Sequence, residues 1–166
     1  MALKLEKDLG NWLYGMKKLV IVGLGNRLRG DDAIGLELIN TLKGRVGDNI
    51  FLIEAETTPE SYTDVISSFK PTHILFVDAA QFNKKPGYTR LISMDEIADL
   101  PLSTHSTSLD TLARYLSQSV SAKIALLGIQ PKCIDFKEEL TREAEEAVKK
   151  AGALLSKLIK KKGLTY

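Results

Sequence analysis

Acidic side chains and one histidine stand where apolar runs of the sequence end. In chain order they are Asp31, Asp32, Glu54, Glu56, Asp78 and His105. If the apolar runs are parallel strands, these side chains meet at one edge of the sheet, where α/β proteins bind ligands. Carboxylates neutralise a divalent metal ion and an imidazole adds a nitrogen donor, so Asp32, Asp78 and His105 are candidate metal ligands. Each also has an ordinary structural role open to it: a helix cap for Asp32, a strand-end turn for Asp78, and a hydrogen-bonded loop histidine for His105.

The glycine-rich stretch GLGNRLRGDDAIG follows the first apolar run. A phosphate-binding loop supplies backbone N–H groups and a lysine. Here Asp31 and Asp32 instead occupy the start of the next helix, where an anion would bind. A dinucleotide-binding fingerprint needs a third glycine three positions after the second, and Leu28 stands there. The stretch therefore favours a loop that presents carboxylates to a cation.

Apolar runs alternate with amphipathic segments along most of the chain. Strands are expected at 18–22, 50–54, 74–77, 88–92 and 124–129, the fourth at an edge of the sheet. Helices are expected over 33–43 and from Thr58, Ser106 and Thr141 onward. This alternation is typical of α/β proteins. We expect a three-layer αβα sandwich around a mostly parallel, twisted sheet of about five strands.

Composition and charge narrow the class of protein. The chain has 166 residues, a formal net charge of +2 and one cysteine. This length suits one domain, the small charge gives no electrostatic support for nucleic-acid binding, and a disulfide within the chain is excluded. No stretch has the pattern of a signal peptide or membrane helix. We expect a cytoplasmic monomer without a membrane partner, with a helical extension at 1–17 before a single α/β domain at 18–166.

Several segments, in order, resemble the [NiFe]-hydrogenase maturation endopeptidases. GLGNRLRGDDAIG is similar to the family's G-x-G-N opening with its Asp pair, and PTHILFVDA to its strand ending in V-D-A. Pro86-Gly87 with Arg90 resembles the family's P-G-x-x-R turn, STH its T-T-H or S-T-H loop, and GIQP its G-I-Q-P segment. The last segment, followed by Phe136, resembles the branch acting on hydrogenase-3-type, formate-hydrogenlyase or energy-converting enzymes. The resemblance covers about residues 18–150.

The resemblance implies an endopeptidase that removes a short C-terminal tail from the hydrogenase large-subunit precursor after nickel insertion. The family's nickel-recognising acids and histidine fall on Asp32, Asp78 and His105, which become the expected catalytic and metal-binding residues. Nickel arrives with the substrate and is not a resident cofactor. Four further polar residues on this rim are expected to contact the substrate: Asn26, Asp31, Glu56 and Gln130.

The sequence departs from the family pattern at three positions. Ala33 replaces the glycine after the Asp pair, Glu56 stands where a small residue is common, and Gln81 replaces a second acid. None of these changes removes a proposed ligand. Glu56 and Gln81 would alter the rim that meets the substrate, so they bear on which hydrogenase is processed.

The chemistry of cleavage stays open at the level of sequence. Cys133 has no second histidine nearby in sequence, and the hydroxyls around His105 suit helix caps. Nickel could polarise the scissile carbonyl or lower the pKa of a bound water, or one of the acids could act as a general base. One alternative is a chaperone that binds nickel or the large subunit without cleaving it. A peptidyl-tRNA hydrolase-like esterase also opens with GLGN, but it is disfavoured because Arg27 stands where that family has proline.

Overall fold

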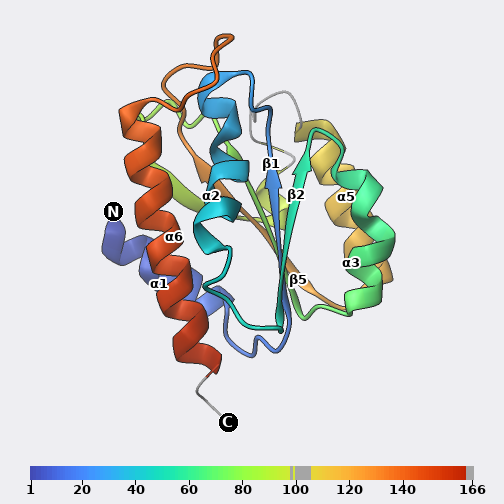
Figure 1. The fold of residues 1–166 in the computed structure, drawn as a ribbon. Coiled ribbons are helices and arrows are strands. Elements are labelled where there is room, and N and C mark those ends of the chain that lie inside the picture. Colours follow the sequence, from blue (N-terminus) through green and yellow to red (C-terminus); the bar gives the residue numbers. More distant parts are fainter. Residues whose placement is uncertain (98, 100–105, 164–166) are drawn as a thin grey trace.

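The computed structural model describes residues 1–97, 99 and 106–163, and within them a five-stranded sheet is covered by helices on both faces (Figure 1). The strands are β1 (Leu19–Leu24), β2 (Ile50–Glu56), β3 (His73–Ala79), β4 (Thr89–Ser93) and β5 (Lys123–Ile129). They lie in the order β2-β1-β3-β5-β4. The first four in this order pair in parallel, and β4 pairs with β5 in antiparallel orientation at the edge. The expected mostly parallel α/β sheet is confirmed.

The helices form a layer on each face of this sheet. They are α1 (Ala2–Trp12), α2 (Ile34–Leu42), α3 (Thr63–Phe69), α4 (Met94–Ile97), α5 (Ser106–Ser119) and α6 (Arg142–Gly163), with short 3₁₀ turns η1 (Gly30–Ala33) and η2 (Pro59–Tyr62). β1 and β3 are buried along their whole length. Because both faces of these strands are covered, they read as continuous apolar runs and not as alternating patterns. No helix in the described part of the chain is long and apolar enough to cross a membrane.

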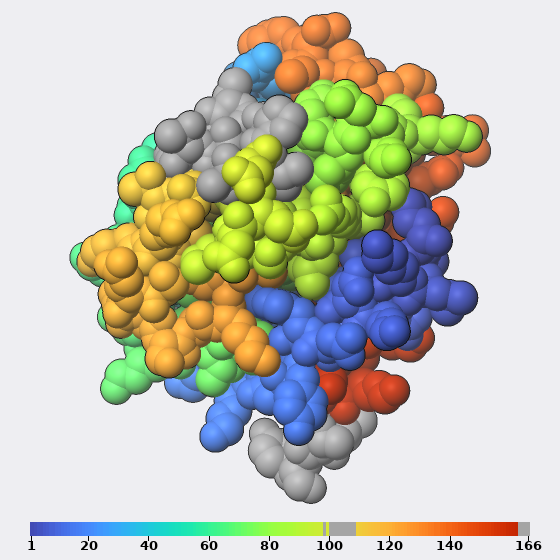
Figure 2. All heavy atoms as spheres, turned by 180° about the vertical axis from the view of Figure 1, so that it is seen from behind, coloured from blue at the N-terminus to red at the C-terminus, as the bar shows by residue number. Residues whose placement is uncertain are grey.

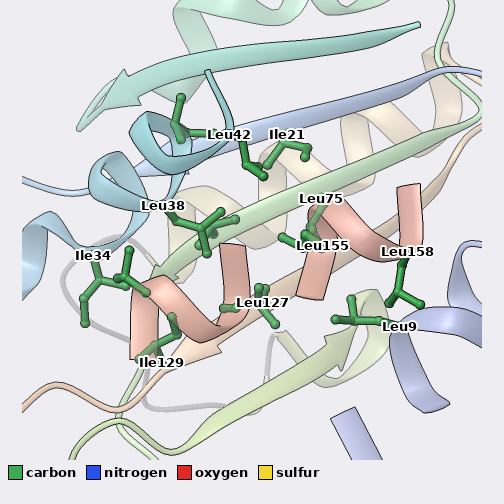
Figure 3. Packing of buried hydrophobic residues seen from close by; sticks show 14 of the residues in the cluster. Leu9, Ile21, Ile34, Leu38, Leu42, Leu75, Leu127, Ile129, Leu155 and Leu158 are labelled. Carbon is green, nitrogen blue, oxygen red and sulfur yellow. The ribbon is translucent and has the colours of Figure 1, made fainter. Parts of the chain in front are cut away.

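Two apolar clusters hold the layers together. One lies between the sheet and the helices α1, α2 and α6, and Figure 3 shows Leu38 and Leu155 packed with Leu75 there. The other lies under α3 and α5 and contains Ile66 and Leu112. Alternate side chains of each central strand enter opposite clusters, as the period of two along a strand requires.

The N-terminal segment contributes to the first cluster. Leu9 and Leu13 are fully buried, and Leu9 lies beside Leu158 of α6 (Figure 3). An ion pair of 2.8 Å between Lys157 and Glu6 also joins α6 to α1. From behind, α1 is seen against the segment that contains β4 (Figure 2). Residues 1–17 therefore share the core of the α/β domain.

His73 fastens this N-terminal segment at the amino end of β3, far along the strand from Asp78. Its Nε2 donates to the Trp12 carbonyl over 2.9 Å, and the Trp12 ring stacks edge-on against the imidazole at 5.0 Å. Burial lowers the pKa of His73 below its ordinary value, because the charged form loses hydration. The folded state thus favours the neutral ring.

We expect the pH dependence of stability to reflect this buried ring. Below the ordinary histidine pKa of about 6.5, the unfolded chain binds the proton first, so the free energy of unfolding falls as pH drops toward the lower pKa of folded His73. Denaturant unfolding between pH 7.5 and 5 measures this slope. His73→Gln, which keeps a donor for Trp12, should reduce it. An equal slope in the variant would assign the effect to other groups.

Candidate functional site

Two glycines bring the start of α2 against the ends of two strands. A Cβ atom at Gly35 would lie 2.2 Å from the Val77 carbonyl oxygen of β3 and 2.3 Å from the Leu24 carbonyl oxygen of β1. At Gly25 the φ angle is +132°, and a Cβ atom would lie 1.7 Å from the Asp32 carbonyl oxygen. Only glycine permits such close approach of backbone to backbone. The two glycines therefore allow η1 and α2 to pack closely against β1 and β3. This packing places Asp32 beside the carboxyl ends of these strands.

Asp32 is 4% exposed and lies in η1. Its Oδ2 accepts a hydrogen bond from the Asn26 backbone N–H over 3.1 Å, and α2 begins without a side-chain cap. The helix-cap role considered for Asp32 is therefore wrong. Its Oδ1 accepts no hydrogen bond from the residues described.

Asp78 lies near the end of β3, opposite Gly128 of β5, and is 2% exposed. Its Oδ1 accepts a hydrogen bond from the Ala79 N–H over 2.8 Å. Because β3 neighbours β1 and packs against η1, Asp78 and Asp32 occupy the same edge of the sheet. His105 lies outside the described residues. Within those residues, no group of three or more His, Cys, Asp or Glu side chains is placed to hold a metal ion.

Asp31 has a different environment from its neighbour. Its carboxylate is fully buried and accepts hydrogen bonds from the backbone N–H groups of Lys132, Cys133 and Thr141 over 2.8, 3.2 and 2.7 Å. The Thr141 hydroxyl donates a fourth, over 2.8 Å. Both carboxylate oxygens are used within the chain. Asp31 therefore fastens the loop between β5 and α6, and its position does not support the expected contact with substrate.

The side chain of Gln130 forms hydrogen bonds with the loop after β3 and with its own loop. Its Oε1 accepts the Phe82 N–H over 2.7 Å, while its Nε2 donates to Gln81 Oε1 over 2.7 Å and to the Pro131 carbonyl over 3.2 Å. With 5% exposure, this side chain shapes the loop after β3. The structure thus places Gln130 behind the rim and brings Gln81, which the chain has in place of an acid, into the same hydrogen-bond network.

Asn26 and Glu56 lie at the surface of the rim. Asn26 Oδ1 accepts the Leu28 N–H over 2.9 Å, and its amide nitrogen makes no hydrogen bond within the described residues. Glu56 is exposed at the end of β2, with φ of +53°, and its carbonyl accepts the Gly25 N–H over 2.9 Å. A left-handed backbone favours glycine, which gives a physical reason for the small residue common here in the family that the sequence resembles.

Two basic side chains near the loop, Arg27 and Lys43, form ion pairs with carboxylates at its flank. Arg27 forms ion pairs with Glu54 over 2.8 Å and Glu37 over 3.4 Å, and Lys43 pairs with Glu54 over 3.1 Å. Burial alone would raise the pKa of Glu54, but the hydrogen bonds from Lys43 and Arg27 outweigh it and hold that pKa below its usual range. Glu54 is thus a partner of cations and not a free carboxylate on the rim.

Replacement of Glu56 by glycine tests two properties of this residue: its backbone strain, read from the free energy of unfolding, and its contact with substrate, read from KM. Relief of the left-handed strain should raise the free energy of unfolding by about 0.5–1 kcal/mol. If Glu56 contacts the substrate, the same change should raise KM for processing. Lys70, with φ of +53° at the end of α3, is the matched control. Lys70→Gly should stabilise without changing KM, and equal KM values for the two variants would exclude a substrate contact by Glu56.

Comparison with known proteins identifies the family of this chain. The model of the hydrogenase maturation protease family, HycI, matches residues 36–158. The chain belongs to this family. It is 31% identical over 130 residues to the hydrogenase 3 maturation protease of Escherichia coli, a match that spans 78% of this chain and 83% of that protein. The family resemblance in the sequence is therefore confirmed.

Solved structures agree with the family assignment. The chain is similar to the crystal structure of the [NiFe] hydrogenase maturation protease HycI from Thermococcus kodakarensis, with a TM-score of 0.84, 31% identity, and coverage of 92% of this chain and 99% of that one. It also shares its fold with the hydrogenase maturating endopeptidase HybD from E. coli, with a TM-score of 0.75, 21% identity, and coverage of 89% and 94%. Peptidase activity in hydrogenase maturation follows from membership of the family.

Proposed function

We propose that this protease removes the C-terminal tail of a [NiFe]-hydrogenase large-subunit precursor after nickel insertion, and that Asp32, Asp78 and His105 recognise the nickel. The observation that carries the proposal is the pair of buried carboxylates at one edge of the sheet, Asp32 in η1 and Asp78 near the end of β3. Close packing at Gly25 and Gly35 sets this edge. Nickel is part of the substrate, so its coordination by the precursor's cysteines would be completed from this rim.

The donor set suits that cargo. Carboxylate oxygens and an imidazole nitrogen bind divalent first-row metals, and two carboxylates offset the charge of the ion. Arg27, an arginine of the same loop, forms ion pairs with Glu37 and Glu54. Its charge is therefore paired with these glutamates and not with Asp32 or Asp78. On this account the rim selects a precursor that already holds its metal.

Hydrolysis places the hydroxyl of water on the new carboxyl terminus of the large subunit and a proton on the amine of the released tail. Polarisation of the carbonyl by the ion, or removal of the water proton by a rim carboxylate, would each promote this step. Cys133 donates its thiol hydrogen bond to Asp135 Oδ2 over 3.4 Å and has no histidine base among its hydrogen-bond partners in the described residues. The one histidine among the described residues, His73, lies at the other end of β3.

The test is a mass measurement on the processed large subunit. Nickel-loaded precursor incubated with the protease should lose one short C-terminal peptide. Intact precursor that remains tightly bound would instead support the non-cleaving chaperone. Retention of the tail with no binding would overturn the proposed function.

A further inference from the structure

The two loops that flank the candidate site are joined into one projecting ridge. Residues 130–141, between β5 and α6, project furthest at the end of the molecule where β1 ends (Figure 1, orange). Lys137 donates its N–H to the Leu28 carbonyl over 2.9 Å, and Gly30 donates to the Lys137 carbonyl over 2.7 Å. A parallel bridge pairs Arg29 with Lys137. The buried Asp31 carboxylate fixes the base of the ridge.

This ridge presents apolar side chains to solvent. Phe136 is 84% exposed and Leu28 is 45% exposed, and the Arg29–Lys137 bridge places the two residues in neighbouring register. Exposed aromatic and aliphatic side chains on an ordered backbone are typical of interface anchors, since little conformational entropy is lost when a partner covers them. We call Leu28 and Phe136 the apolar ridge.

An acidic cleft of about 690 Å³ adjoins this ridge, with Leu28 in its wall. Its lining contains four glutamates and one arginine: Glu37, Glu138, Glu139, Glu145 and Arg27. Arg27 and Glu145 already have partners, in Glu37 and Lys149 respectively. Glu138 and Glu139 are exposed and form no ion pair within the part of the chain that the structure describes. The cleft therefore offers negative charge beside an apolar anchor.

We propose that the apolar ridge and this cleft dock a segment of the large-subunit precursor that carries an apolar side chain next to lysine or arginine. The inference rests on the proposed function. Charge complementarity favours a basic segment, and the same loop carries Leu28 and Asp32, so a protein that brings its metal to the rim must lie against the ridge. Docking here is separate from the chemistry, because neither Leu28 nor Phe136 belongs to the carboxylate edge.

The test compares Phe136→Ala with a matched control, Leu3→Ala, whose side chain is 84% exposed on α1. For Phe136→Ala, the Kd for nickel-loaded precursor should rise about tenfold, the effect of an interface anchor worth about 1.4 kcal/mol. KM should rise with it while kcat is kept. Glu138→Gln combined with Glu139→Gln should weaken binding and flatten its salt dependence. Leu3→Ala should change none of these values, and the melting temperatures of the variants should match the wild type.

Four outcomes decide the proposal. Weaker binding by Phe136→Ala supports it, even if the wild type binds the precursor without cutting it, a result that would overturn only the proposed cleavage. Unchanged Kd and KM for Phe136→Ala would overturn the docking surface. Loss of self-association in sedimentation, with precursor binding intact, would make the ridge an interface between copies of this chain. No binding of the precursor by the wild type would overturn both proposals.

Discussion

Asp31→Ala is expected to lower the free energy of unfolding by about 3–4 kcal/mol. The change leaves the part-buried N–H groups of Lys132 and Thr141 without the charged acceptor that they use in the folded chain, and each such loss costs about 1–3 kcal/mol. Denaturant unfolding at pH 7 measures the difference. Asp31→Asn should fall between alanine and wild type, because one amide oxygen can still accept while the amide N–H₂ faces other donors.

Asp48→Ala is the control for this loss, since Asp48 is exposed before β2. Its effect should stay within about 0.5 kcal/mol of wild type. If Asp31→Ala were as stable as Asp48→Ala, the hydrogen bonds around Asp31 would not hold the loop, and the ridge that depends on it would lose its anchor.

Asp32→Asn and Asp78→Asn are each expected to reduce processing of nickel-loaded precursor by about 100-fold or more. Loss of residues that only support metal ligands typically costs about 10–100-fold, and on our proposal these two carboxylates meet the ion directly. Asparagine keeps the volume and one acceptor oxygen, so the N–H groups of Asn26 and Ala79 can retain their partners. Rates from single-turnover processing, read by product mass, measure the effect.

Asp48→Asn makes the same change of charge at the opposite end of the sheet and should process at the wild-type rate. Comparable melting temperatures for all three variants would show that the losses are functional. Wild-type processing by Asp32→Asn would remove Asp32 from the nickel site, and the same reasoning applies to Asp78→Asn.

The sheet and the main helices were predictable from sequence because strands buried on both faces appear as continuous apolar runs between amphipathic segments. In a chain with alternating amphipathic segments, a continuous apolar run as short as ILFV at 74–77 is typical of a strand covered by helices on both sides. Short elements such as α4 and η1 leave no such record, because four residues span barely one turn and show no periodicity. The family motifs also indicated which of these elements end or begin with the polar residues of the candidate site.

The roles of Asp31 and Asp32 could not be separated from sequence. Both follow β1 and precede α2, but the partners of Asp31 lie on a loop about a hundred residues later in the chain. Only tertiary structure shows that Asp31 faces inward to that loop while Asp32 faces the rim. The hydrogen bonds of Gln130 were unpredictable for a similar reason, since they reach back to the loop after β3.

Glu56 differs from these residues because its signal is local. A glutamate where a small residue is common indicates either that the strain is tolerated or that stability is given up for a substrate contact. The φ of +53° shows that the backbone favours glycine there. His73, by contrast, gave no signal in sequence, because nothing local predicts that Trp12 will cover the start of β3.

The most direct test of this account is the nickel dependence of tail removal. The same precursor, prepared with and without nickel, is incubated with the wild-type protease, and the mass of the large subunit is followed over time. We predict rapid loss of the C-terminal peptide from the loaded precursor and none from the nickel-free form. Equal rates for the two forms would contradict the claim that the carboxylate edge at Asp32 and Asp78 recognises the metal carried by the substrate.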